Sequence, residues 1–170
     1  MRITILNGEH ADEYWYLRQE ALKQNGEAFA TTYEEAMDRE NPVEKTKLNL
    51  MSNGSITYGS WENGTLVGVV TLLLEKHTKM KHKAHIMAMY VNEEYRGKGI
   101  ARSLLQTVIK KSKELGLEQL HLTVVSSNTA AVNLYTSVGF QTYGIEKRSM
   151  KYNGVYFDEA HMVNFFHTIP

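Results

Sequence analysis

The chain has 170 residues and a mass of 19.4 kDa, which is the usual size of one domain, and its 42% hydrophobic residues can fill a core and exclude disorder. Nineteen lysines and arginines balance nineteen aspartates and glutamates, so no net positive field exists to hold a nucleic acid. With no cysteine, the chain has no disulfide framework, thiolate nucleophile or cysteine-ligated zinc.

No segment has the pattern of a membrane span or a targeting signal. The longest strongly apolar stretch, residues 66–74, falls well short of the ~20 residues that a helix needs to cross a bilayer. The apolar start, residues 1–6, gives way at once to polar residues, which leaves no room for a signal peptide. We therefore expect a cytoplasmic protein that does not span a membrane.

The first part of the chain predicts a strand followed by helices. Residues 2–6 form a short apolar run, and residues 9–24 carry apolar side chains at helical spacing. Asn41 before Pro42 is typical of an N-cap followed by a first-turn proline, so a second helix is expected over residues 42–51.

Two Asn-Gly pairs predict β-hairpins, because both residue types tolerate the positive φ of a type I′ turn. Asn63-Gly64 joins the strand-like segments 55–62 and 65–75. Asn153-Gly154 joins segments 140–152 and 155–166.

Between the hairpins the pattern changes to strand, helix, strand, helix, over residues 84–91, 99–115, 119–125 and 128–138. A strand, helix and strand in this order form a parallel pair with a right-handed crossover. The fold class expected is therefore α/β of the α+β type, with a mixed, mostly antiparallel sheet of about seven strands and flanking helices in one domain over residues 1–170.

A glycine-rich loop, Arg96-Gly97-Lys98-Gly99-Ile100-Ala101, stands between the expected strand 84–91 and the long helix. Two glycines there let backbone N–H groups converge at a helix N-terminus, which suits a phosphate, although a tight strand-to-helix turn is the alternative. A Rossmann site would need glycine where Arg102 stands, and a Walker loop would need serine or threonine after Lys98.

This loop is part of a longer pattern that resembles the GCN5-related N-acetyltransferase (GNAT) superfamily. The resemblance covers residues 84–140 strongly, and the order of elements on both sides fits the same fold. The residues that carry it are Met89-Tyr90-Val91, Glu94-Tyr95-Arg96-Gly97-Lys98-Gly99-Ile100-Ala101, Leu122, Val124, Asn128, Ala131, Leu134-Tyr135 and Gly139-Phe140.

The resemblance implies acetyl-CoA as co-substrate and assigns its contacts. Backbone N–H groups of Arg96 to Ala101 would cradle the pyrophosphate, and the pantetheine arm would lie between two splayed parallel strands, bonded to the backbone of Met89, Tyr90 and Val91. Asn128 would meet a pantetheine amide, or serve only as an N-cap. Tyr135, two helical turns later, would bind the cofactor and donate a proton to the leaving thiolate, or serve only as a core aromatic.

A base is also expected, because an alkyl amine is almost wholly protonated at neutral pH. His85 interrupts an apolar strand and is the leading candidate, with a sheet histidine bonded to a carbonyl as the alternative. Glu75 and His121 are the next candidates. His77, His82 and His85 have no standard ligand spacing, so no metal is expected.

The acceptor is expected to be a primary amine of a small molecule or amino-acid derivative, attacked directly in a ternary complex. Tyr33 and Glu34, between the first two expected helices, are candidate acceptor contacts, or belong to an ordinary exposed turn. A protein or peptide acetyltransferase and a non-catalytic acyl-CoA-binding module are the alternatives. No nucleic-acid or membrane partner is expected, and a homodimer is one possible oligomeric state.

Overall fold

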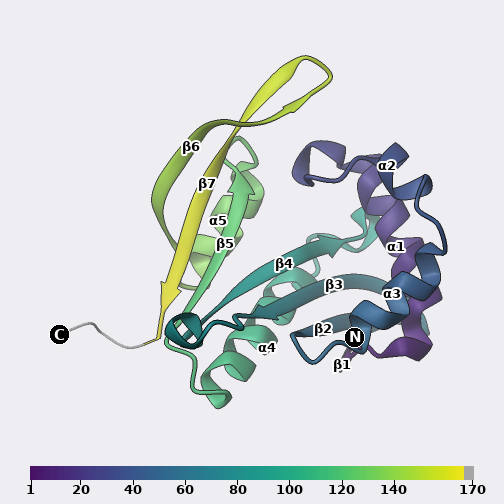
Figure 1. The fold of residues 1–170 in the computed structure, drawn as a ribbon, viewed down its shortest axis with the longest axis horizontal. Coiled ribbons are helices and arrows are strands. Elements are labelled where there is room, and N and C mark those ends of the chain that lie inside the picture. Colours follow the sequence, from purple (N-terminus) through teal and green to yellow (C-terminus); the bar gives the residue numbers. More distant parts are fainter. Residues whose placement is uncertain (167–170) are drawn as a thin grey trace.

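The computed structural model describes residues 1–166 and forms one seven-stranded sheet with the strand order β1-β2-β3-β4-β5-β7-β6 (Figure 1). Within these residues, β4 and β5 form the parallel pair and the other neighbours are antiparallel. The mixed sheet and the flanking helices confirm the fold class predicted from the sequence. The expected domain runs to residue 170, and its end, residues 167–170, lies outside the described residues.

The elements follow the predicted order closely. The strands are β1 Arg2–Ile5, β2 Ser55–Glu62, β3 Thr65–Leu74, β4 Lys83–Val91, β5 Gln119–Val125, β6 Gln141–Tyr152 and β7 Val155–Phe165. The helices are α1 Ala11–Gln24, α2 Tyr33–Met37, α3 Pro42–Leu50, α4 Ile100–Glu114 and α5 Thr129–Ser137, with short 3-10 turns at Gly8–His10, Gly26–Ala28, Thr78–Met80 and Glu93–Tyr95.

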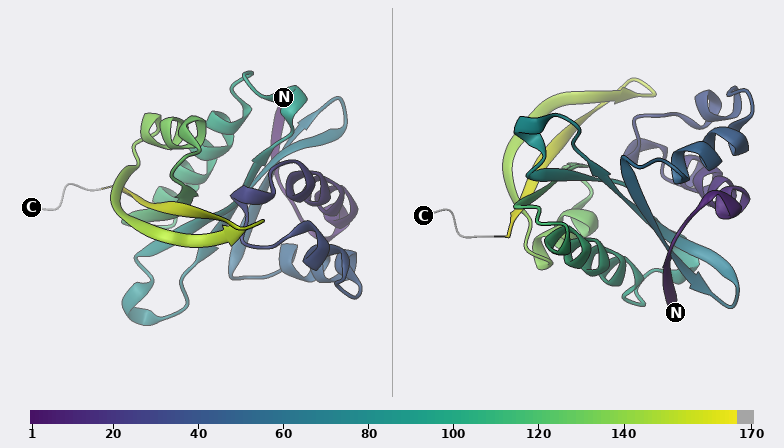
Figure 2. Two further views of the ribbon diagram at one scale, coloured as in Figure 1. Left: turned by 90° about the horizontal axis from the view of Figure 1, so that it is seen from above. Right: turned by 60° about the horizontal axis from the view of Figure 1, so that its bottom comes forward.

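Helices cover both faces of the sheet, with α4 and α5 on one side and α1 to α3 on the other (Figure 2). Successive strand residues point to opposite faces, so one strand can serve two cores. On β3, Val70 and Leu72 join the cluster under α4, whereas Val69 beside them joins a smaller cluster against α1. Burial on both faces explains why β3 is a nearly continuous apolar run.

Both Asn-Gly pairs form the predicted turns, with positive φ at Asn63, Gly64, Asn153 and Gly154. Asn41 is the N-cap of α3 and Pro42 its first residue, as predicted, and the Asn41 carbonyl accepts from the Lys45 N–H. Asn41 has a φ of 49°, however, and its side chain makes no capping hydrogen bond. The helix expected to be second is the third, because the short helix α2 precedes it and begins with a capping box between Thr32 and Glu35.

The parallel strands separate soon after they meet. β4 and β5 pair only from Lys83 with Gln119 to His85 with His121, and beyond that point β5 pairs with β7 alone. A β-bulge on β4 follows: Met87 pairs with Thr71 and Tyr90 with Val69, and Ala88 between them has a φ of 51°. The edge of β4 that faces β5 is therefore open over residues 86–91, among the residues described.

No helix within residues 1–166 has the length and apolar character needed to cross a membrane. The expected cytoplasmic location stays a prediction.

Candidate active site

The loop before α4 presents a run of unpaired backbone N–H groups. Gly97 and Gly99 have φ values of 75° and 79°, a conformation that glycine adopts without steric cost. From Gly97 to Arg102, no backbone N–H donates to any residue in the described part of the chain, and Ser103 is the first to bond, to the Gly99 carbonyl. These groups stand at the positive end of the α4 dipole, which suits an anion.

Arg96 tethers the loop, and its backbone N–H is already bonded. Its backbone N–H donates to the Glu93 carbonyl, so the open cradle begins one residue after the sequence motif does. Its side chain donates from Nε to the Val91 carbonyl at 2.9 Å and from Nη2 to Oδ1 of Asn25 at 2.9 Å, and it lies over the ring of Tyr90. Arg96 therefore fixes the loop against β4 and the end of α1.

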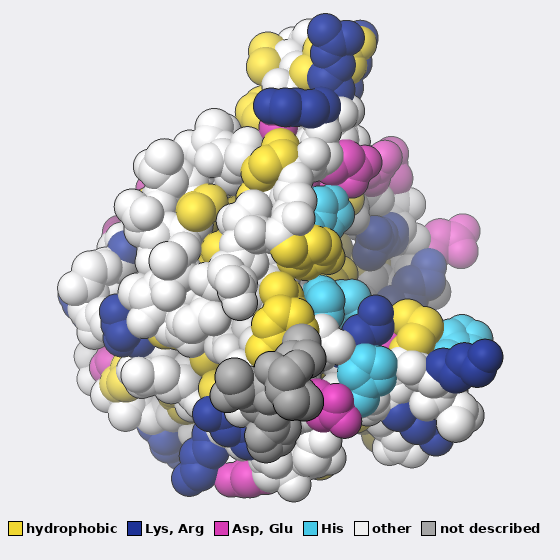
Figure 3. All heavy atoms as spheres, turned by 90° about the vertical axis from the view of Figure 1, so that its left-hand side faces the viewer, with side chains coloured by type: hydrophobic (Ala, Val, Ile, Leu, Met, Phe, Trp, Pro, Cys, Tyr) yellow, Lys and Arg dark blue, Asp and Glu magenta, His cyan; other side chains and the backbone are white. Residues whose placement is uncertain are grey.

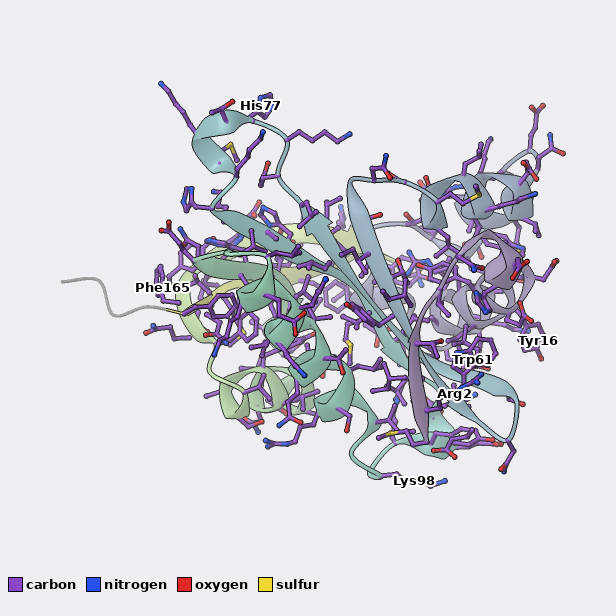
Figure 4. The ribbon with its side chains drawn as sticks, turned by 90° about the horizontal axis from the view of Figure 1, so that it is seen from below. Arg2, Tyr16, Trp61, His77, Lys98 and Phe165 are labelled. Atoms are coloured by element: carbon purple, nitrogen blue, oxygen red, sulfur yellow. The ribbon has the colours of Figure 1, made fainter. Side chains whose placement is uncertain are left out.

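Lys98 is also engaged within the loop. Its Nζ donates to the Glu94 carbonyl at 3.0 Å and lies 4.7 Å from the centre of the Tyr95 ring. Figure 4 shows Lys98 at the outer turn of the loop, pointing away from the body of the protein. The chemistry that this loop offers is thus backbone N–H donation at the start of a helix.

The segment after the bulge, Met89 to Val91, lies along the open edge of β4. Met89 and Val91 pack with the main core, and Tyr90 turns to the opposite face, where its hydroxyl donates to Glu20 and Gln24 on α1, each at 2.9 Å. Burial and the bond to Glu20 raise the pKa of Tyr90, so its hydroxyl is structural. What this segment can offer a ligand is its unpaired backbone edge.

Helix α5 carries the two residues singled out by the sequence motif. Asn128 caps it, because its Oδ1 accepts from the Ala131 N–H at 3.1 Å. Tyr135 is 8% exposed, its ring packs edge-on against Phe140, and its hydroxyl bonds to no described residue. Burial raises the pKa of Tyr135 to about 12, so the phenol is neutral and able to donate at physiological pH.

His85 stands where β4 and β5 separate, and Nε2 of its ring lies 2.9 Å from Oε1 of Glu75. Because a carboxylate only accepts, the imidazole donates through Nε2, and in its neutral form Nδ1 is left as the acceptor. The His121 ring lies 5.6 Å away, and burial, followed by the charge of His85, lowers the pKa of His121. The structure thus brings together the three residues that the sequence proposed as candidate bases.

The same sheet face continues across β5 to β7 and β6. Tyr143 stacks edge-on with His121 and lies near His161, which hydrogen-bonds Glu146 at 3.1 Å. Figure 3 shows histidine and hydrophobic side chains alternating down this face below the β6–β7 hairpin. The face is therefore open, partly apolar and rich in imidazole, in agreement with the exposure of Leu73, Met87, Tyr143 and Ile145.

A cavity of about 200 Å³ lies between this face and helices α1 and α3, beside the bulge. Neutral side chains line it, and no carboxylate is among them: Tyr14, Thr46, Asn49, Leu50, Ser55, Thr57, Thr71, Met87 and Ala88. Tyr33 and Glu34 lie on α2 and do not line this cavity, so their acceptor role stays a prediction. Tyr14 and Thr71 were missed because helical spacing and strand alternation give them the pattern of ordinary core positions.

Outside this region, a groove of about 360 Å³ lies between α4 and the end of α5, and its cations are Arg102, Lys110 and Lys113. Within the described residues, no group of three histidine, aspartate or glutamate side chains is placed to hold a metal ion. Figure 4 shows His77 at the tip of the β3–β4 connection, projecting from the body of the protein.

Comparison with known proteins identifies the family. The model of the Acetyltransferase (GNAT) family matches residues 12–140. The chain is 32% identical over 136 residues to the uncharacterized N-acetyltransferase YdgE of Bacillus subtilis, covering 76% of this chain and 84% of that protein. It is 27% identical over 101 residues to the L-amino acid N-acetyltransferase AaaT of Escherichia coli, covering 59% of this chain and 62% of that one.

The fold agrees. The structure of YncA from Salmonella typhimurium with its cofactor acetyl-CoA matches with a TM-score of 0.85 and 19% identity, covering 100% of this chain and 97% of that one. Because the family model spans most of the chain and the match to YdgE covers most of both proteins, this chain belongs to the GNAT acetyltransferase family and is an acyltransferase.

Proposed function

We propose that this protein is an acetyl-CoA-dependent N-acetyltransferase that acetylates a primary amine of a small molecule or amino-acid derivative. The observation that carries the proposal is the run of unpaired N–H groups over residues 97–102, which stands beside an open strand edge over residues 86–91. Few protein ligands need both features. A pyrophosphate followed by an amide-containing arm uses the first as an anion cradle and the second as a strand partner.

The cofactor-binding residues follow from this arrangement. The backbone N–H groups of Gly97, Lys98, Gly99, Ile100 and Ala101 would hold the pyrophosphate. Arg96 belongs to the same loop but acts by anchoring it.

The open edge over Met89, Tyr90 and Val91 would bind the pantetheine arm. Asn128 keeps its side-chain NH₂ group free while its oxygen caps α5, so both roles expected for it are compatible. Acetyl-CoA supplies the acetyl group as a thioester.

His85 is the proposed general base. Glu75 fixes the imidazole with Nε2 as the donor, so Nδ1 is the atom that accepts the amine proton, directly or through water. His121, with its lowered pKa, stays neutral and places no positive charge beside the incoming amine. Glu75 thus acts through His85 as a positioning residue.

Tyr135 is the proposed donor to the leaving sulfur. A phenol with a pKa of about 12 does not transfer its proton fully to a thiolate whose reference pKa is ~8.5. It can stabilise the developing negative charge through a short hydrogen bond, and its hydroxyl is free of any other described partner. Tyr135 would thus stabilise the thiolate by a hydrogen bond, whereas the general acid implied by the family resemblance would transfer its proton to the thiolate.

Transfer is proposed to occur by direct attack, because the chain has no cysteine to carry the acetyl group. A small acceptor is favoured over a peptide by the modest cavity beside the bulge and by the similarity to AaaT, an L-amino acid N-acetyltransferase. The test is release of free CoA across a panel of amines, amino acids and peptides. Tight acetyl-CoA binding with no release from any acceptor would favour the binding module instead.

A further inference from the structure

Arg18 on α1 is a half-buried cation without an anionic partner. Its guanidinium carbon lies 4.4 Å from the centre of the Phe29 ring, and the group makes no hydrogen bond or ion pair with any residue from 1 to 166. Its electrostatic neighbours are the phenol of Tyr14, which acts on it more strongly, and another cation, Arg39, which also has no ion-pair partner in the same range. Neither neighbour is a carboxylate.

Other charged side chains of the site region have hydrogen-bonding or ion-pair partners, whereas Arg18 has none among the described residues. Arg96 is paired with Glu93 and Asn25, His85 with Glu75, and Glu20 accepts from Tyr90 and Asn92. Burial of a charge is unfavourable unless a partner compensates it. Burial lowers the pKa of Arg18, Tyr14 opposes that shift and the charge of Arg39 adds to it, so no carboxylate among the described residues compensates this guanidinium.

The position of Arg18 places it at the acceptor side of the site. Tyr14, one helical turn earlier on the same face of α1, lines the cavity beside the bulge and is the residue that interacts most strongly with Arg18. The Phe29 ring under the guanidinium lies 6.5 Å from the Tyr90 ring. Arg18 therefore lies next to a residue that lines the cavity, on the side of α1 that faces Phe29 and, through it, Tyr90 of β4.

We infer that Arg18, assisted by the charge of Arg39, binds a carboxylate of the acceptor, so that the acceptor is an amine that also carries a carboxylate, as a free amino acid does. The inference rests on the proposed function. A guanidinium presents a rigid fork of N–H donors that matches a carboxylate with two parallel bonds. The Phe29 ring, 4.4 Å from the guanidinium carbon, holds the side chain by a cation–π contact that uses none of its N–H donors.

The test compares free L-amino acids with their own α-carboxamides, which differ only in the negative charge. Steady-state kinetics and calorimetric titration into the CoA-saturated protein are measured for the wild type, Arg18→Gln and Arg18→Lys. Arg2→Gln, which removes a cation on the edge strand β1, is the control (Figure 4). Arg18→Lys keeps the charge but loses the fork.

In the wild type, the acids are expected to bind more tightly than the amides. Arg18→Gln should raise KM and Kd for the acids by about tenfold to a hundredfold, the scale of a hydrogen bond to a charged group, and leave those for the amides unchanged. For Arg18→Lys, KM and Kd for the acids should lie between those of the wild type and Arg18→Gln, and Arg2→Gln should have the wild-type values. Acetyl-CoA affinity should be the same in all four proteins.

Three results would overturn the inference: equal binding of acids and amides by the wild type, equal losses for both in Arg18→Gln, or a loss of acetyl-CoA affinity in that variant. The second would make Arg18 structural, and the third would make a cofactor phosphate its partner. Failure of the proposed function is distinct, because it would show as no CoA release from any amine while calorimetry still reports whether the acids bind.

Discussion

Nε2 of His85 and Oε1 of Glu75 lie 2.9 Å apart, at the point where the two parallel strands separate. The contact crosses from the end of β3 to β4, and it selects which imidazole nitrogen is free to accept a proton. The pair gives the proposed base a fixed orientation and leads to two separable predictions.

Replacing His85 removes the proposed proton acceptor. His85→Gln keeps a hydrogen-bonding side chain next to Glu75 but cannot accept a proton, so kcat/KM should fall by about 10²-fold or more, the scale of general base catalysis. An unchanged kcat/KM would exclude His85 as the base.

Replacing the positioning residue should have a smaller effect. Glu75→Gln keeps the shape of the contact and removes its charge, so kcat should drop by about tenfold while KM for acetyl-CoA stays constant. The matched control is Glu146→Gln, which removes the carboxylate beside His161 on the outer strands. If both variants lose the same activity, Glu75 has no special relation to the reaction.

Two glycines at opposite ends of α4 allow the proposed cofactor-binding loop to be tested with a matched control. Gly99 and Gly116 have φ values of 79° and 73°, and a Cβ at either would meet no atom within 4 Å. Glutamate at both positions therefore brings a similar backbone strain of about 1–2 kcal/mol. Only Gly99→Glu places a carboxylate at the anion cradle, so it should abolish acetyl-CoA binding in calorimetry while Gly116→Glu retains it. Retained affinity in Gly99→Glu would mean that the loop does not bind the cofactor.

Tyr135→Phe separates chemistry from binding. The hydroxyl has no described partner to lose, so thermal stability should be unchanged, and kcat should fall by about 10²-fold with acetyl-CoA affinity unaffected. The measurements are kcat and the calorimetric affinity for acetyl-CoA, made on the same preparation of Tyr135→Phe. A fall in affinity without a fall in kcat would make Tyr135 a binding residue only.

The lowered pKa of His121 has a consequence for stability. The unfolded chain, with a histidine pKa of ~6.5, takes up a proton at a higher pH than the folded protein does, so stability falls as the pH drops below that value. His121→Gln removes this contribution. Between pH 7.5 and 5.5, its urea midpoint should decline less than that of the wild type; an equal or larger decline would contradict the assignment.

The sequence predicted the parts of the fold that depend on local chemistry. Asn-Gly pairs define two hairpins, and the strand, helix, strand order defines the parallel pair, because backbone preference and periodicity act over a few residues. Helix α2 was missed, since its five residues, Tyr33–Met37, are too few to show a period.

The motif residues of the site were predictable, but their partners were not. Neither the Glu75–His85 contact nor the placement of Arg18 over Phe29 follows from spacing, because strand register and helix packing bring those residues together. Arg18 in particular stands in an amphipathic helix, where a lone arginine is typical of a solvated face. Only the structure shows that it lacks an anionic partner.

Initial rates of CoA release, measured while acetyl-CoA and an accepted amine are both varied, test the central claim most directly. Direct attack in a ternary complex predicts double-reciprocal lines that intersect, with no acetylated protein detectable by mass spectrometry when the amine is omitted. Parallel lines together with a stoichiometric acetyl-enzyme would contradict it.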